Sequence, residues 1–183
     1  MLAKVLSSAV LGIDAYHVEV EVDITSGLPN FTTVGLPETA VKESKERVKS
    51  AITNSGYRFP DDRITVNLAP AHIKKEGTGF DLPIALGILT ATGIIPTDHS
   101  APFLALGELS LDGRIKPVKG SLSMALAAKE SGHHRIFVPF ENSKEAAVVT
   151  DIEVLPVRTL AEVIGYLRGY SQLEAQEADV DTL

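Results

Sequence analysis

The chain has 183 residues, 44% of them hydrophobic, so it can bury one sizeable core within a single domain. It contains no cysteine and no tryptophan, which excludes disulfides, thiolate metal sites and cysteine nucleophiles. Seventeen basic against 24 acidic residues give a formal net charge of −7, so bulk electrostatics do not attract nucleic acid. Without a secretory signal or an apolar run of ~18 residues, we expect a cytoplasmic chain with no membrane contact.

Antiparallel strands are expected in the first half of the chain. In the segment 17–24, Val18, Val20 and Val22 alternate with polar residues, which is typical of a strand with one wet face. Its short connection to the preceding segment indicates a hairpin. The strands of this half are expected at 4–13, 17–24, 31–36 and 64–69, with a helix at 38–55 before Gly56.

Helices alternate with strands in the second half, which favours parallel pairing there and a mixed α/β sheet overall. A hairpin turn is predicted at Asp112-Gly113, between strands at 103–111 and 114–118. Helices are expected at 82–93, 120–131, 141–149 and 159–168, and further strands at 135–139 and 152–157.

The densest local signal is the stretch 74–83, which stands between a predicted strand and a predicted helix. Gly77 and Gly79 flank Thr78 and permit a tight turn, Asp81 is placed to cap the helix, and Pro83 suits its first turn. A glycine turn before a helix N-terminus suits an oxyanion or phosphate, but a purely structural turn needs the same residues. Both interpretations stay open.

Lysines form two groups that could make a local basic face. Lys42, Lys45 and Lys49 recur at spacings of three and four on one side of the first predicted helix, and Lys74 and Lys75 enter the glycine turn. Such a charged stripe is either a solvated helix face or a contact for DNA phosphates.

Several motifs are absent. The chain has no Gly-Lys-Ser or Gly-Lys-Thr and therefore no P-loop, and no serine stands in a Gly-x-Ser-x-Gly elbow. Its five histidines lack ligand spacing. We therefore predict no catalytic residue, no metal site and no cofactor in this chain.

Six motifs in order resemble a known family over nearly the whole chain. They look like the N-terminal domain of the Mg-chelatase-like AAA+ ATPases, the ComM/YifB family. The motifs are MLAKV (1–5), VGLP (34–37), VKES (41–44), RITVNLAPA (63–71), KKEG with FDLPIA (74–77 and 80–85) and GELSLDG (107–113).

The resemblance implies a Lon-protease-like fold over residues 1–170. An AAA+ motor that uses ATP and Mg follows this domain in the family, so the acidic segment 171–183 is expected to be a flexible tail or linker toward it. The family forms rings, which implies a homo-hexamer assembled through the motor. It acts on single-stranded or branched DNA, where ATP hydrolysis drives branch migration in recombination and natural transformation.

The resemblance also places the Ser–Lys dyad of Lon proteases at Gly79 and Leu122. Neither residue can serve as a nucleophile or base, so a non-catalytic scaffold with DNA contacts is expected. The alternatives are a protein-interaction module without DNA contact, metal insertion by a chelatase, and a peptidase whose dyad has moved to Thr78 or Ser121 with Lys119.

Overall fold

The computed structural model describes residues 1–11, 13–97 and 102–178 of the chain. Within them, the strands are β1 (Leu2–Leu11), β2 (Asp14–Thr25), β3 (Asn30–Val34), β4 (Arg63–Ala69), β5 (Leu104–Ala105), β6 (Glu108–Leu109), β7 (Ile115–Lys116), β8 (Arg135–Pro139) and β9 (Glu153–Val157). The helices are α1 (Thr39–Lys42), α2 (Ser44–Asn54), α3 (Asp81–Ala91), α4 (Ser121–Glu130), η1 (Phe140–Asn142), α5 (Ser143–Ala146) and α6 (Leu160–Leu167).

The main sheet is mixed, with the strand order β3-β4-β2-β1-β5-β8-β9. Strands β1 and β2 form the predicted hairpin, and β2 also pairs antiparallel with β4, so that Val20 stands opposite both Val5 and Leu68. The pairs β5–β8 and β8–β9 are parallel. The predicted mixed α/β fold is confirmed.

Strand β3 departs from the expected antiparallel first half, because it pairs parallel with β4. The chain leaves β3 through α1 and α2 and returns to the same edge of the sheet. Such a crossover brings the next strand back in the same direction, whereas a short turn would reverse it.

The predicted strand at 103–111 is divided in two by Gly107. Its first part, β5, belongs to the main sheet, and its second part, β6, forms a separate ribbon with β7. The chain changes direction at Gly107 because both backbone groups of this residue bond outside the sheet. Its N–H donates to the carbonyl of Gly79 (2.9 Å), and its carbonyl accepts from the N–H of Leu82 (3.0 Å). The chain therefore leaves the sheet where it meets the glycine turn.

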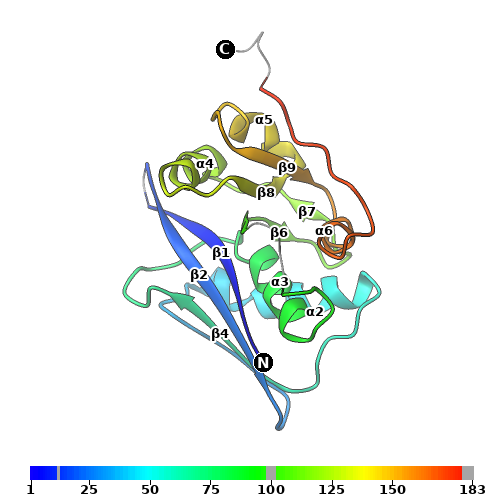
Figure 1. Ribbon diagram of the computed structural model, residues 1–183. Coiled ribbons are helices and arrows are strands. Elements are labelled where there is room, and N and C mark those ends of the chain that lie inside the picture. The colour runs from blue at the N-terminus through cyan, green and yellow to red at the C-terminus, as the bar shows by residue number, and fades with distance from the viewer. Residues whose placement is uncertain (12, 98–101, 179–183) are drawn as a thin grey trace.

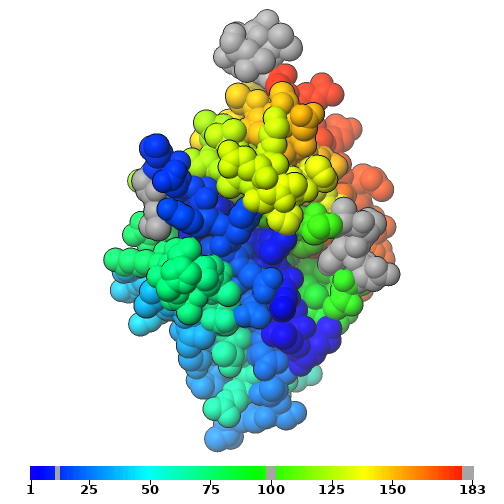
Figure 2. Space-filling model, turned by 60° about the vertical axis from the view of Figure 1, so that its left-hand side comes forward, coloured from blue at the N-terminus to red at the C-terminus, as the bar shows by residue number. Residues whose placement is uncertain are grey.

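Helices cover the sheet unevenly. Helices α2, α3 and α6 contribute to a core on one face, where all eleven residues of α3 are buried. Helices α4 and α5 cover β8 and β9 on the other face, which Figure 1 shows as the upper part of the molecule. Figure 2 shows β1 and β2, in blue, uncovered below the yellow-green α4, and their exposed face carries charged side chains such as Lys4 and Glu19.

The C-terminal segment was expected to be loose after Tyr170, but its described part is attached. Leu173 packs against the core, and the N–H of Gln176 donates to the carbonyl of Val154 in β9 (2.8 Å). Figure 1 shows this segment passing from α6 along the side of the molecule beyond β9. Residues 179–183 of the expected tail lie outside the described residues. Among the described residues, none of the helices has the length and apolar character that a membrane span requires.

Candidate functional site

The glycine turn joins β4 to the buried helix α3. Pro83 lies in the first turn of α3, as predicted. Gly77 has a φ of +82°, a left-handed conformation that favours glycine. The expected capping role of Asp81 is wrong: Phe80 occupies the cap position, and α3 begins at Asp81 without a side-chain cap. The Asp81 carboxylate is engaged elsewhere.

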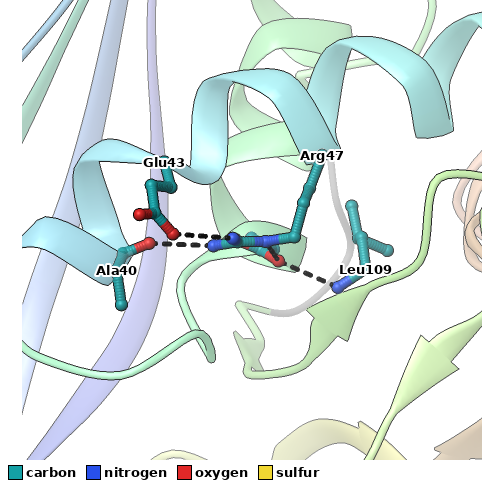
Figure 3. A network of polar contacts seen from close by, with 5 residues as sticks. Ala40, Glu43, Arg47 and Leu109 are labelled. Atoms are coloured by element: carbon teal, nitrogen blue, oxygen red, sulfur yellow. Dashed lines mark hydrogen bonds and ion pairs between the residues drawn. The ribbon is translucent and has the colours of Figure 1, made fainter.

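Arg47 of α2 holds that carboxylate in a two-pronged ion pair. Its Nε donates to one carboxylate oxygen at 2.6 Å and its second terminal nitrogen to the other at 3.0 Å. The backbone N–H of Leu109, in β6, donates to the same carboxylate at 3.0 Å. Arg47 also bonds the carbonyl of Ala40 (2.8 Å) and approaches Glu43 (3.9 Å), as Figure 3 shows. The network joins α1, α2, α3 and the β6–β7 ribbon.

Burial and pairing have opposite effects on the pKa of the Asp81 carboxyl. Removal from water raises the pKa of the Asp81 carboxyl, and the bonds from Arg47 and from the Leu109 N–H oppose that rise. The bond to Asp81 raises the pKa of the Arg47 guanidinium. All of these donors and acceptors are used within the chain, so the arrangement is that of a structural clamp and not of a free catalytic carboxylate.

Gly79 and Leu122, where the resemblance places the Lon dyad, have no side chain that could act as a nucleophile or a base. A Cβ atom at Gly79 would lie 2.8 Å from Cδ1 of Leu106 and 3.5 Å from Cγ1 of Val118, so apolar side chains occupy the space that a serine would need. Leu122 lies at the start of α4 and is 36% exposed. An apolar surface therefore stands at both dyad positions.

The relocated dyad is not assembled either. Ser121 is buried and its hydroxyl has no hydrogen-bond partner in the described part of the chain, so a substrate could not reach it. Lys119 is exposed, and no hydrogen bond among the described residues joins it to Ser121 or to Thr78. A lysine base must lie within hydrogen-bond reach of its nucleophile.

Lys75 is not on the surface, which corrects its expected place in a DNA-facing group. Its side chain is 0% exposed and donates to the carbonyl of Pro70. Its backbone is fixed as well, because its N–H donates to Leu36 and its carbonyl accepts from Glu38. Burial lowers the pKa of the Lys75 ammonium. Its role is to anchor the turn.

The other four lysines are exposed. Lys42 lies in α1, Lys45 and Lys49 in α2, and Lys74 in the glycine turn, where it pairs with Glu38 at 2.7 Å. The structure therefore connects Lys74 with the start of α1 through Glu38. Lys49 lies 5.9 Å from the ring centroid of Phe59. A role of these four lysines in DNA contact stays a prediction.

A shallow hollow beside the clamp brings together cations that are distant in sequence. It lies between α2 and the β6–β7 ribbon, and its wall includes Arg47, Arg114 and Lys116 as well as Glu108 and Asp112. Arg47 is committed to Asp81, and Arg114 pairs with Asp112 at 3.0 Å. Mixed charges and internal pairs make it a poor anion site. Among the described residues, no cluster of three or more potential metal ligands is present.

Comparison with known proteins assigns the chain to a family. Residues 20–142 match the family model described as subunit ChlI of Mg-chelatase. The chain belongs to this Mg-chelatase-like family, which confirms the resemblance of its motifs. It is 42% identical over 172 residues to the competence protein ComM of Haemophilus influenzae, and that alignment covers 94% of this chain and 34% of ComM.

The chain is also similar to two further relatives. An uncharacterized protein of Mycobacterium tuberculosis is 44% identical over 181 residues, covering 99% of this chain and 36% of that protein. Lon protease 2 of Bacillus subtilis is 30% identical over 163 residues, covering 80% of this chain and 29% of the protease. The chain thus spans about a third of the length of the curated relatives it matches.

The clamp was not found by sequence reasoning. Arg47 stands in a lysine-rich helix and looks like one more solvated cation, and Asp81 looks like a helix cap. Their separation of 34 residues carries no spacing signal. Asp81 lies in the family motif FDLPIA, whereas Arg47 lies three residues after the motif VKES (41–44) and in none of the quoted motifs.

Proposed function

We propose that this chain is the non-catalytic N-terminal domain of a ring-forming AAA+ ATPase that acts on DNA in the cytoplasm. In this proposal the motor domain of the full-length protein binds ATP and Mg²⁺, assembles a homo-hexamer and drives branch migration of joint DNA. The domain described here supplies a scaffold and basic side chains. Membership of the family supports the proposal. The activity itself is proposed by analogy with the family.

The proposed non-catalytic role rests on the residues found at positions 79 and 122, where the resemblance places the Lon dyad. Leu106 and Val118 fill the space beside Gly79, and Leu122 has no proton to exchange. Gly79 is also held by its carbonyl, which accepts from Gly107. A Lon-type fold can keep its scaffold under such replacements while losing the nucleophile and the base.

Exposed lysines support the DNA-facing role. Lys42, Lys45 and Lys49 lie on consecutive helices, and Lys74 is joined to the start of α1 through Glu38. A local cluster acts within a Debye length of ~8–10 Å, so the net charge of −7 does not exclude it. Because each subunit would neutralise only a few phosphates, binding should be weak and salt-sensitive per subunit and gain strength in a ring.

A protein-interaction module without DNA contact is the second candidate. Leu122 and Leu126 are exposed four residues apart on α4, a spacing that puts them on one side of the helix. Together with the acidic total charge, this apolar pair favours a protein partner over a nucleic acid.

The deciding experiment measures DNA binding and branch migration by the full-length protein carrying Lys42→Glu with Lys45→Glu, and separately Lys74→Glu. Lys74 is changed alone because its neighbour Lys75 is buried. The control is Lys129→Glu with Lys144→Glu, two exposed lysines at α4 and α5. We expect the α1–α2 double variant to lose affinity and to show a shallower salt dependence, with ATPase activity kept.

If affinity and salt slope are unchanged in the α1–α2 variant and in Lys74→Glu, the DNA-facing role is wrong and the interaction module is favoured. The non-catalytic role is tested separately, with a fluorogenic peptide and with ATP. Peptide cleavage by this domain that Thr78→Ala or Lys119→Ala abolishes would overturn it, as would phosphate release from ATP by the domain alone.

A further inference from the structure

Leu36, between β3 and α1, is an unusual leucine in two respects. Its side chain is 53% exposed, and its backbone has a φ of +56°, a left-handed conformation that residues with a Cβ rarely adopt. Among the described residues, Asp151 is the other non-glycine residue at positive φ. Residues in such conformations persist only where their surroundings impose them, and they concentrate at functional sites.

The surroundings of Leu36 do impose this conformation. The preceding residue, Gly35, lies so close to β4 that a Cβ there would come within 2.3 Å of the carbonyl oxygen of Leu68. On the other side, the carbonyl of Leu36 accepts from the N–H of Lys75 (3.0 Å), and the N–H of Glu38 donates to the carbonyl of Lys75 (2.9 Å). Lys75 is itself held by its buried ammonium. The exposed leucine is therefore presented by a turn that is fixed at both ends.

Two lysines lie in the segments that hold the turn of Leu36. Lys74 directly precedes Lys75, whose N–H bonds the carbonyl of Leu36. Lys42 lies in α1, and its N–H donates to the carbonyl of Glu38 (3.0 Å). The carboxylate of Glu38 pairs with Lys74, which leaves the exposed Lys42 ammonium without an ion-pair partner among the described residues. The unpaired Lys42 is available to a phosphate, and the exposed apolar side chain of Leu36 is available to the face of a base, a combination that suits a nucleic acid.

We propose that Leu36 is a wedge that contacts the face of an unstacked base in single-stranded or branched DNA. This inference rests on the DNA-facing role proposed above and names the residue that recognises an open base. Proteins that part neighbouring bases insert a single apolar side chain such as leucine, and a rigid turn avoids the loss of entropy on binding. Leu36 and Val34, which is 43% exposed two residues earlier, make a small apolar surface, whereas a stable protein interface buries roughly 1,200–2,000 Å².

The test compares Leu36→Gly with wild type in the full-length protein. Glycine removes the side chain and accepts the positive φ without strain, so the turn is expected to keep its shape. The probe is a forked DNA with 2-aminopurine at the junction, whose fluorescence rises when the base unstacks. We expect Leu36→Gly to bind the fork about tenfold more weakly and to lose the fluorescence rise, while Leu36→Phe keeps both. Binding to blunt duplex should not change.

The control is Leu28→Gly, which removes another leucine that is 88% exposed in the loop before β3, and it should leave fork binding unchanged. If Leu36→Gly binds and unstacks the fork like wild type while the α1–α2 lysine variant is impaired, the wedge is wrong and the DNA-facing role stands. If neither variant is impaired, both proposals fail. If Leu36→Gly changes the oligomeric state and leaves DNA binding intact, the leucine serves a protein contact and the wedge is overturned.

Discussion

Arg47 on α2 holds both carboxylate oxygens of Asp81, the first residue of α3. The same carboxylate accepts from the N–H of Leu109 in β6, so a single aspartate connects two helices and the β6–β7 ribbon. Asp81 is buried, whereas Arg47 is half-buried and reaches the surface beside Glu43. The carboxylate is therefore the member of the pair that depends most on its partner.

Removal of one partner of this pair should be strongly destabilising. We expect Arg47→Met to lower the free energy of unfolding by about 3 kcal/mol, because it leaves the buried Asp81 carboxylate without its counter-ion. Urea unfolding followed by circular dichroism measures this change. Arg58→Met is the control, since Arg58 is 84% exposed and its pair with Asp61 should contribute less than about 1 kcal/mol. Equal losses in the two variants would contradict a buried clamp.

The buried ammonium of Lys75 predicts a pH dependence. Because burial lowers the pKa of Lys75 below its ordinary value of 10.5, the unfolded chain binds more protons than the folded chain between the lowered pKa and 10.5. The stability contribution of Lys75 therefore rises with pH through that window. Lys75→Met removes this slope. Urea unfolding at several pH values should show wild type gaining stability relative to Lys75→Met as the pH rises toward 10.5, and a difference that moves the other way would refute the assignment.

Two glycines at positive φ should respond very differently to alanine. At Gly35, a Cβ would meet the Leu68 carbonyl oxygen at 2.3 Å, and this backbone atom cannot move without breaking the sheet. At Gly77, a Cβ would meet nothing within 4 Å. We expect Gly35→Ala to cost at least about 3 kcal/mol, from backbone strain and overlap together, and Gly77→Ala about 1 kcal/mol from strain alone. Thermal unfolding of the two variants side by side measures the difference, and similar midpoints would show that Gly35 is not wedged against β4.

Introducing a serine at position 79 and a lysine at position 122 should not produce peptidase activity. Gly79→Ser pushes a side chain into Leu106 and Val118, so it should lower the free energy of unfolding by about 1–3 kcal/mol and leave the hydroxyl in an apolar contact. Adding Leu122→Lys should not produce cleavage of a fluorogenic peptide. Leu106→Ala should cost less stability in the Gly79→Ser background than in wild type, because the serine fills part of the space that the leucine leaves. Cleavage by the Gly79→Ser, Leu122→Lys variant would show that a peptidase site can form here and would contradict this prediction.

Elements defined by local pattern could be predicted from the sequence. The alternation of Val18, Val20 and Val22 with polar residues predicts strand β2 with one face toward solvent, as the structure has it. The apolar run after Asp81 likewise predicts the buried helix α3. The Asp112-Gly113 turn also forms as predicted, because the Asp112 carboxylate accepts from the N–H of Arg114. Each of these signals lies within a few residues of the element that it specifies.

Features set by distant contacts could not be predicted. Lys74 and Lys75 are adjacent and chemically identical, but one is exposed and the other buried, because the loop pairs with Leu36 through the backbone of Lys75. The parallel direction of β3 depends on where α1 and α2 cross, and the division of the 103–111 segment depends on bonds between Gly107 and the glycine turn. These outcomes are decided by tertiary contacts that no local pattern encodes.

Helix α3, with all eleven residues buried, has a consequence for how the domain can be monitored. Its amide protons can reach solvent only when β1, β2 and α2, which pack around it, come apart. Hydrogen exchange in α3 should therefore proceed by global opening, and its slowest amides should report the stability of the whole domain. A ligand that binds the folded chain at any site would slow these amides by the same factor, so they provide a sensor for partners that does not require the binding surface to be known.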